Sequence, residues 1–505
     1  MLPPQRRLPD LEDLIGQKLY FVVHAPRQTG KTTIFRALAR TLAAGRRYAA
    51  VHASCEAGAV AGGDVEGGIS AVLRSIERQA QILPEDARPE PVETVAAVHP
   101  NSRLVTYLTR WCERSRRPVV LFLDEIDALL DDTLLSVLRQ LREGYPDRPE
   151  RFPQSMALVG LRDVRDYRTR ARPDADNLGT SSPFNIKVES LTLPDFTAEE
   201  VAELYEQHTG ETGQVFAAEA TALAWELTRG QPWLVNALAR QAVTRLATDR
   251  SRPVTAEIVE RAKEELILRR DTHLDSLVHR LREPRVQRVI EPILAGELLP
   301  PDVLNDDVQF VKDLGLVTAG PAGLEVANPI YREVIPRALT WVLEQSLPVA
   351  QASYVAADGS LDYDRLLADF RGFWCRHAEF FLSRQPYSEA AAQLIFMAYL
   401  QRVVNGGGFI DREYGVGNGR IDLCVRWPRP AGVDRWAIEL KVWRDGAADP
   451  LPDGLRQLGA YLERLGLERG TLVVFDDRSE AAPVPERCSV EEMDHHGRRM
   501  TVLRL

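Results

Sequence analysis

An apolar stretch, a glycine-containing loop and a helical pattern follow one another near the amino terminus, and their order restricts the fold more than any other feature. Residues 18–23 (KLYFVV) predict a buried strand, HAPRQTGKTT follows at once, and a helical pattern runs from Ile34 to Leu42. Further strands are predicted at residues 48–54 (YAAVHAS), 117–127 (RPVVLFLDEID) and 154–163 (QSMALVGLRD). Strands that alternate with helices predict a doubly wound α/β domain with a parallel sheet.

The loop between the first strand and the first helix carries a phosphate-binding pattern. APRQTGKT, from Ala25 to Thr32, matches G-x-x-x-x-G-K-[ST] except at Ala25, where glycine is usual. In such a loop the backbone N–H groups and the helix N-terminus hold phosphate, because both present unpaired donors. Lys31 would supply charge to the terminal phosphates, and the Thr32 hydroxyl would bind Mg²⁺. The predicted nucleotide-contacting residues of the loop are Ala25, Pro26, Arg27, Gln28, Thr29, Gly30, Lys31, Thr32 and Thr33.

Two acidic residues end the strand VVLFLDEID. We expect Asp124 to hold Mg²⁺, directly or through water, and Glu125 to orient the attacking water. The alternative is an acid pair that only starts a helix, and the presence of the phosphate-binding loop argues against it. The two motifs together predict ATP and Mg²⁺ as cofactors.

From residue 195 onward the periodicity becomes helical. Thr197 and Glu200 have the spacing of a capping box. The predicted domains are a P-loop core (1–194, with 81–101 and 168–185 as surface segments), a helical lid (195–270), a winged helix with a hairpin at LVTAGPAGLEVANP (271–340) and a helical linker (341–384).

The stretches HAPRQTGKTT, LFLDEID, LVGLRDVRDY, LTLPDFTAEEV and LTRGQPWLVNALA together resemble AAA-like and STAND-like bacterial P-loop ATPases over residues 1–340. The resemblance implies a nucleotide-binding core, a helical lid and a winged helix. It also implies that Arg162 is a sensor residue near the γ-phosphate, with an ordinary surface arginine as the alternative. Pro232, in GQP, is implied to start a lid helix near the nucleotide.

A second pattern lies in DRWAIELKVW, residues 434–443. Glu439 and Lys441 stand two apart in an apolar strand and therefore share a face. A hairpin with the upstream strand GNGRIDLCVRW would bring Asp422 close to Glu439. Two carboxylates can hold Mg²⁺, and Lys441 could stabilise charge or position water. The alternative is a structural ion pair near a sheet edge.

The set Asp422, Glu439 and Lys441 resembles the PD-(D/E)XK nuclease superfamily over residues 385–505, although RID replaces the usual proline-containing motif. The resemblance implies a restriction-endonuclease-like α/β domain that uses Mg²⁺ or Mn²⁺. It also implies that Glu389 is a further metal-binding acid, with a dipole-stabilising first-turn acid as the alternative. Gln457 and Tyr461 match a Q-x-x-x-Y element, with an ordinary amphipathic pair as the alternative.

Composition limits the remaining function classes. A chain of 505 residues predicts three or more domains. The net charge of −10 argues against a protein that simply coats nucleic acid, so DNA contact would need local patches. Five cysteines without a CxxC pair fit a reducing cytosol. No signal peptide and no run of roughly 18 to 20 apolar residues is present, so we expect a cytoplasmic protein without membrane contact.

One candidate patch contains six arginines, and its alternative is a solvated helical face paired with Asp271, Asp275 and Glu283. The arginines are Arg269, Arg270, Arg280, Arg282, Arg285 and Arg288.

The sequence therefore predicts an ATPase whose nucleotide state gates a Mg²⁺-dependent nuclease acting on DNA rather than RNA. By analogy, such a protein would serve genome defence or mobile-element biology. The competing hypothesis is a STAND-like sensor whose degraded nuclease fold binds DNA or protein. Homo-oligomerisation and a protein trigger stay open.

Overall fold

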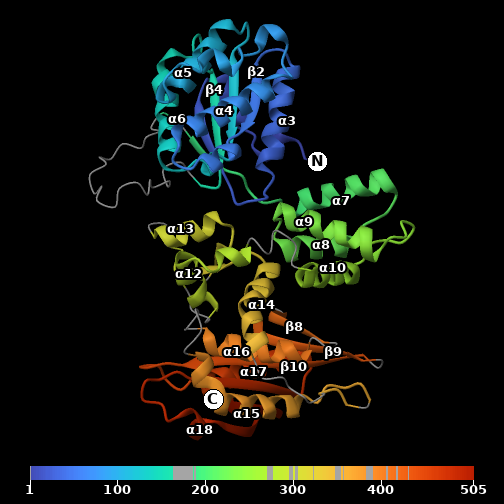
Figure 1. The fold of residues 1–505 in the computed structure, drawn as a ribbon. Coiled ribbons are helices and arrows are strands. Elements are labelled where there is room, and N and C mark those ends of the chain that lie inside the picture. Colours follow the sequence, from blue (N-terminus) through green and yellow to red (C-terminus); the bar gives the residue numbers. More distant parts are fainter. Residues whose placement is uncertain are drawn as a thin grey trace. The chain divides into compact units, whose positions relative to one another are not determined.

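The structure is a computed structural model, and it describes residues 2–162, 186, 189–269, 277–294, 299–301, 305–321, 323–346, 354–356, 358–382, 390–404, 408–416, 419–429 and 432–505. The chain divides into two compact units (Figure 1). Unit 1 comprises Met1–Leu266 with Lys312–Gly315, and unit 2 comprises Ile267–Val311 with Leu316–Leu505.

Unit 1 contains a five-stranded sheet in the order β2-β3-β4-β1-β5, and every pairing in it is parallel. The four strands predicted from the sequence are present. The fifth strand, β5, was not predicted, because its sequence ESLT is short and mostly polar. The strands are β1 (Tyr20–His24), β2 (Ala49–Ser54), β3 (Val119–Asp124), β4 (Ser155–Gly160) and β5 (Glu189–Thr192).

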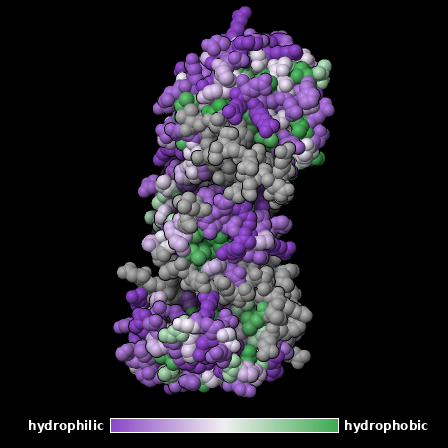
Figure 2. Space-filling view, turned by 90° about the vertical axis from the view of Figure 1, so that its left-hand side faces the viewer, coloured by the Kyte–Doolittle hydropathy of each residue, from purple (hydrophilic) through white to green (hydrophobic). Residues whose placement is uncertain are grey.

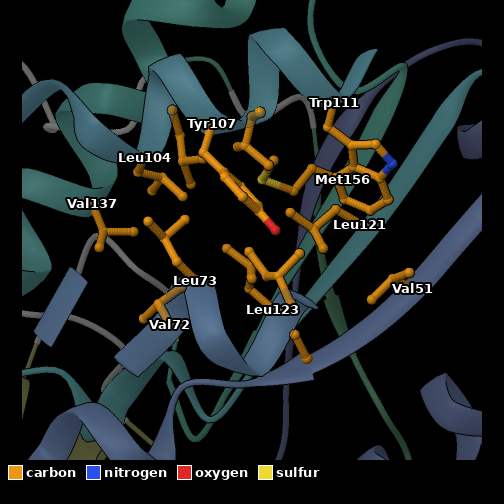
Figure 3. Packing of buried hydrophobic residues seen from close by; sticks show 14 of the residues in the cluster. Val51, Val72, Leu73, Leu104, Tyr107, Trp111, Leu121, Leu123, Val137 and Met156 are labelled. Atoms are coloured by element: carbon orange, nitrogen blue, oxygen red, sulfur yellow. The ribbon is translucent and has the colours of Figure 1, made fainter. Parts of the chain in front are cut away.

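Helices cover both faces of this sheet, which explains why β1, β3 and β4 are mainly apolar and almost entirely buried. On one face α4, α5 and α6 bury a core that includes Leu73, Trp111 and Met156 (Figure 3). On the other face α2 and α3 pack around Phe35 and Phe122. The helices of this part are α1 (Pro4–Arg7), α2 (Leu11–Gly16), α3 (Lys31–Ala44), α4 (Val65–Ala80), α5 (Pro100–Arg114) and α6 (Asp131–Gly144), with the 3-10 helices η1 (Glu56–Ala61), η2 (Glu85–Ala87), η3 (Val92–Val95), η4 (Ile126–Ala128) and η5 (Tyr145–Asp147).

The segment 81–101, expected to be a surface insertion, instead contributes to the core. Leu83, Ala87 and Val95 are 0–1% exposed and belong to the cluster beneath α4 and α5. The Trp111 indole N–H also donates to the carbonyl of Ala87 over 2.8 Å. The prediction was wrong because it rested on the many prolines and acidic residues of this segment and gave too little weight to its few apolar side chains. The second predicted surface segment, 168–185, lies outside the described residues.

A helical region follows β5, as predicted. Its first helix begins with the expected capping box, because Thr197 Oγ1 accepts from the Glu200 N–H while the Glu200 carboxylate accepts from the Thr197 N–H. Pro232 occupies the first position of α9, where a missing N–H is tolerated. The helices are α7 (Ala198–Thr212), α8 (Ala218–Thr228), α9 (Pro232–Gln241), the π-helical η7 (Ala242–Leu246) and α10 (Ala256–Arg269).

The elements between residues 284 and 346 are two helices, a hairpin and a long helix. The predicted hairpin at 316–329 is confirmed, since β6 and β7 pair antiparallel with Val317 opposite Val326. The elements are α12 (Pro284–Leu294), α13 (Asp306–Asp313), β6 (Val317–Gly320), β7 (Gly323–Val326) and α14 (Pro329–Ser346). The last two residues of α13 are grouped with unit 1.

The carboxyl-terminal part of unit 2 is built on a mixed six-stranded sheet in the order β12-β13-β11-β10-β9-β8. Strands β10, β11 and β13 run parallel, and the remaining pairings are antiparallel. The last two strands were not predicted. The strands are β8 (Phe409–Val416), β9 (Gly419–Arg429), β10 (Gly432–Trp443), β11 (Arg469–Asp476), β12 (Ser489–His495) and β13 (Arg498–Arg504).

Helices lie on both faces of the six-stranded sheet. Leu458 and Leu462 of α17 pack with Leu472 and Val502 on one face. On the other face, Tyr363 stacks on Trp436 with centroids 5.1 Å apart, and Trp374 contacts Phe475. Tyr363 and Trp374 belong to α15, so this helix contributes to the core although residues 341–384 were predicted as a linker. The helices are α15 (Tyr363–Leu382), α16 (Ala391–Val404), α17 (Leu451–Leu465) and α18 (Val484–Arg487).

The surface in Figure 2 is mostly hydrophilic where residues are described, with small separate groups of hydrophobic side chains. Among the described residues, no helix combines the length and the apolar character that crossing a membrane requires.

The burial of residue 83 and the exposure of residue 82 provide a test of the packing of segment 81–101. Leu83 is 1% exposed and Ile82 is 61% exposed. We expect Leu83→Ala to lower the free energy of unfolding by about 2–5 kcal/mol, because it leaves a cavity in the core. Ile82→Ala should change it by less than about 0.5 kcal/mol. Urea unfolding of the full chain measures both, and equal effects would contradict this packing.

Candidate functional site

A cavity of about 1080 Å³ in unit 1 is formed by the phosphate-binding loop, the ends of β3 and β4, and helices α7 and α9. Its polar lining includes Lys31, Thr32, Asp124 and Glu125, which the sequence predicted as a group. Apolar and aromatic residues from the helical region complete it, namely Phe196, Tyr205, Phe216, Pro232 and Trp233. Of the nine predicted loop residues, Ala25 and Pro26 are the two that do not line the cavity.

The loop folds around two residues with positive φ, Gln28 (61°) and Gly30 (92°). Gly30 is the N-cap of α3, and its left-handed conformation explains the need for glycine there. Ala25 is not among the described residues with positive φ, and its side chain is 1% exposed in the core between the sheet and α3. The alanine that replaces the usual glycine is therefore accommodated without backbone strain.

Lys31 begins α3, and its ammonium group folds back onto the loop. Its Nζ donates to the carbonyl oxygens of Ala25 and Pro26, each over 2.7 Å. Burial lowers the pKa of Lys31 to about 8, against the attraction of Asp124 and Asp127. A phosphate group would supply the opposite charge that the two carbonyl dipoles only partly replace.

Asp124 accepts hydrogen bonds on both carboxylate oxygens. Oδ2 accepts from Thr32 Oγ1 (2.6 Å) and from His52 Nε2 (3.0 Å), and Oδ1 accepts from the Glu125 N–H (2.9 Å). Burial raises the pKa of Asp124, but the hydrogen bonds from His52 and Thr32 outweigh it, and the net shift is downward. The carboxylate thus stays charged beside the Thr32 hydroxyl. This oxygen pair suits Mg²⁺, which prefers oxygen ligands.

Glu125 adopts a left-handed backbone with φ of 56°, which is uncommon for a residue with a side chain. Its carboxylate accepts a short hydrogen bond from the Ser54 hydroxyl at the end of β2. The predicted water-orienting group is therefore held by a neighbouring strand. The sequence reading missed both His52 and Ser54, although polar residues at the end of the buried strand YAAVHAS are the signal that could have revealed them.

Arg162 follows β4, as expected for the predicted sensor. Its Nε lies 2.9 Å from Asp313 Oδ2, with the side chains 12% and 5% exposed. Arg162 is not among the described residues that line the cavity, whereas Pro232 is. The sensor role of Arg162 therefore stays a prediction.

The second predicted site lies on β10, which pairs with β9 on one side and β11 on the other. Glu439 and Lys441 therefore lie on an inner strand of the sheet. The alternative hypothesis of an ion pair near a sheet edge is wrong about this position. The antiparallel register sets Ile438 opposite Leu423, which brings Asp422 beside Glu439 as the predicted hairpin required. Asp422 Oδ2 accepts from the Leu440 N–H over 2.7 Å.

Three predicted residues form a chain of hydrogen bonds. Lys441 Nζ donates to Glu439 Oε1 (2.8 Å) and to Gln457 Oε1 on α17 (2.6 Å). The Gln457 amide thereby orients the lysine from the helix that covers this face. Tyr461, one turn along α17, packs against the apolar cluster under the helix. Gln457 of the Q-x-x-x-Y pair therefore contacts the predicted triad.

Glu439 is 3% exposed, and its buried Oε2 atom has no hydrogen-bond partner within the described part of the chain. Burial and, to a smaller extent, the Asp422 charge raise the pKa of Glu439 to about 7 in spite of the opposing effect of Lys441. A cation would satisfy the orphaned oxygen and reduce the repulsion between the two carboxylates, so the residues fit a divalent metal. Over the described ranges no group of three His, Cys, Asp or Glu residues gathers as a metal site, and Glu389 lies outside them.

The arginine patch is largely paired where it is described. Arg285 and Arg288 both contact Asp307, at 2.7 Å and 2.6 Å, and Arg280 contacts Glu283 at 2.6 Å. These pairs favour the solvated helical face over a phosphate-binding patch. Arg270, Asp271 and Asp275 are outside the described residues.

The raised pKa of Glu439 predicts a pH-dependent effect of Glu439→Gln. The folded chain keeps a proton that unfolded glutamate releases near pH 4.3, so wild-type stability falls as pH rises from about 4 to 7. Glutamine does not titrate, so the Glu439→Gln variant does not lose stability in this way as the pH rises. From pH 5 to pH 8 the variant should gain on the order of 2–4 kcal/mol relative to wild type.

Urea unfolding of the full chain at both pH values measures the difference, with the exposed Glu491→Gln as control. A purely structural ion pair predicts a loss of roughly 3–5 kcal/mol at both pH values, because Lys441 would lose its partner. That pH-independent result would exclude the proposed carboxylate repulsion.

Comparison with known proteins gives a family match that lies within unit 1. Residues 15–167 match the model of a family described as an AAA domain. Similar solved structures include the Walker-type ATPase of Pyrococcus abyssi (15% identity, 66% of this chain and 96% of that chain, TM-score 0.47). The RuvB Holliday junction branch migration motor of Thermotoga maritima (16%, 65%, 92%, 0.35) and Cdc6p of Pyrobaculum aerophilum (16%, 68%, 94%, 0.36) are also similar.

No curated protein matches the sequence. The family match supports an AAA domain, and with it a P-loop ATPase, in the N-terminal region.

Proposed function

We propose that this chain is an ATP-hydrolysing enzyme whose nucleotide state controls a Mg²⁺-dependent nuclease acting on DNA. In this proposal residues 1–194 form the ATPase core, 195–270 the lid, 271–340 a winged helix and 385–505 the nuclease domain, with α15 packed against the sheet of that last domain. The observation that carries the nuclease is that Asp422 on β9 lies beside Glu439 and Lys441 on the paired inner strand β10. Asp422 accepts from the Leu440 N–H, and Lys441 donates to Glu439.

The ATPase part of the proposal follows from the cavity. Lys31 would exchange the carbonyls of Ala25 and Pro26 for phosphate oxygens, which bind an ammonium more strongly. Thr32 and Asp124 would hold Mg²⁺, which neutralises phosphate charge when bound. Glu125 would give up its hydrogen bond from Ser54. It would then orient the attacking water and accept a proton from it.

The nuclease part assigns Asp422 and Glu439 as metal ligands. Lys441, held by Gln457, would place its positive charge where the phosphodiester gains negative charge. A bound Mg²⁺ or Mn²⁺ would polarise the phosphate. Glu439 must lose its proton to bind a cation, so its raised pKa makes metal binding favour pH values above about 7.

Control of one activity by the other requires two global states with different affinities for ATP. The support for this part is the presence of both groups in one chain, with the helical region and the hairpin-containing segment between them in sequence. A role in genome defence or mobile-element biology is an analogy from this architecture.

A second candidate is a non-catalytic regulator whose C-terminal fold binds DNA or protein. The observation in its favour is the low exposure of Glu439, 3%, together with its ion pair to Lys441. A buried, paired carboxylate can serve structure alone.

Replacement of Lys31 and Glu125 tests the ATPase. We expect Lys31→Ala to abolish ATP turnover and weaken ATP binding, because the main cation for phosphate is lost. Glu125→Gln should bind ATP but hydrolyse it at least about 100-fold more slowly, since the base is lost. Steady-state phosphate release and equilibrium binding measure these effects, with the exposed Arg40→Ala on the same helix as control. Wild-type turnover in Lys31→Ala would refute the site.

Cleavage of DNA by the full chain tests the nuclease and its control. With Mg²⁺, wild type should cut single- or double-stranded DNA at a rate that ATP alters. Asp422→Asn, Glu439→Gln and Lys441→Ala should each abolish cutting, whereas Glu491→Gln should not. Lys31→Ala should keep cutting but lose the response to ATP. DNA binding without cleavage in wild type, with no effect of Mn²⁺ on the melting temperature, would favour the second candidate.

A further inference from the structure

A buried histidine beside the nucleotide cavity has no role in the chemistry described above. His52 lies on β2, is 7% exposed, and neighbours Phe122 across the parallel pairing with β3. It alternates with Val51 and Ala53, which join the core on the α4 side, so its imidazole lies on the α3 side of the sheet. That side is otherwise apolar around Phe35 and Phe122.

The imidazole has one hydrogen bond in the described part of the chain, from Nε2 to Asp124 Oδ2 over 3.0 Å. The Asp124 carboxylate also receives the Thr32 hydroxyl and the Glu125 N–H, and a carboxylate oxygen can only accept, so Nε2 carries the hydrogen in this pair. A polar side chain in an apolar core is unfavourable unless it has a partner. Asp124 therefore accounts for the presence of histidine at this position.

His52 differs from the other two donors to Asp124. The Glu125 N–H is the next backbone group in the chain, and the Thr32 hydroxyl belongs to an exposed side chain at the start of α3. Of these three donors, His52 is the one that reaches Asp124 from the neighbouring strand β2. It can hold Oδ2 in place independently of the phosphate-binding loop.

We propose that His52 is a positioning residue that orients Asp124 for Mg²⁺ when nucleotide is bound. This inference rests on the proposed role of Asp124 in holding that ion. Partners that hold a metal-binding carboxylate from behind commonly change metal affinity by about 10- to 100-fold when they are removed. The inference predicts that His52 affects Mg²⁺-dependent binding of nucleotide and leaves Mg²⁺-independent binding alone.

The experiment compares the affinity of the full-length protein for a fluorescent ATP analogue in Mg²⁺ and in EDTA. His52→Leu should weaken binding about 10- to 100-fold in Mg²⁺ and less than about twofold in EDTA. His52→Gln places an amide N–H near the Nε2 position and should restore most of the affinity. His52→Asn is polar but too short to reach Asp124 and should behave like His52→Leu. The Mn²⁺ resonance spectrum of the ternary complex gives a second readout that does not depend on turnover.

Equal losses in Mg²⁺ and EDTA, or no loss in His52→Leu, would overturn the positioning role. Asp124→Asn separates this from the proposed function. If Asp124→Asn weakens Mg²⁺-dependent binding and His52→Leu does not, only the inference on His52 fails. If wild type binds equally in Mg²⁺ and EDTA, the proposed Mg²⁺ site fails and His52 has no positioning role.

Discussion

The nucleotide cavity depends on keeping one buried carboxylate charged. Asp124 is 1% exposed, and an isolated carboxylate in that position would take up a proton. Donors from three separate parts of unit 1 prevent this: Thr32 at the start of α3, His52 on β2 and the backbone of Glu125. The parallel sheet makes this possible, because it brings the carboxyl ends of β2 and β3 together beside the loop that follows β1.

At Glu439 in unit 2, burial has a larger effect on the pKa than the hydrogen-bond donors together have, which is the opposite of Asp124. Glu439 is also buried, but one of its oxygens has no hydrogen-bond partner among the residues that the structure describes, and Asp422 adds a like charge. Lys441 offsets only part of this, so the pKa of Glu439 rises where that of Asp124 falls. An arrangement that leaves a carboxylate short of donors is unfavourable for the empty protein and favourable for a cation. This contrast is the physical ground for proposing a metal at the second site.

Much of each site was predictable because its residues are close in sequence or have a regular spacing. The loop from Ala25 to Thr33 follows β1, and Asp124 and Glu125 stand at the end of β3, so two recognisable motifs at strand ends predicted the group. Glu439 and Lys441 share a face because side chains alternate along a strand. Segment 81–101 was predicted wrongly, since its burial depends on contacts with α4 and α5 and not on its own composition.

The sequence by itself indicated the nature of the N-terminal domain, four of its five strands and which charged residues stand at the ends of those strands. Local patterns suffice for these, because strand periodicity and loop chemistry act over a few residues. Only the tertiary structure decided that His52 and Ser54 hold Asp124 and Glu125, that β10 is central in its sheet, and that Gln457 reaches Lys441. These contacts join residues 16 to 72 positions apart, and their formation depends on how strands and helices pack.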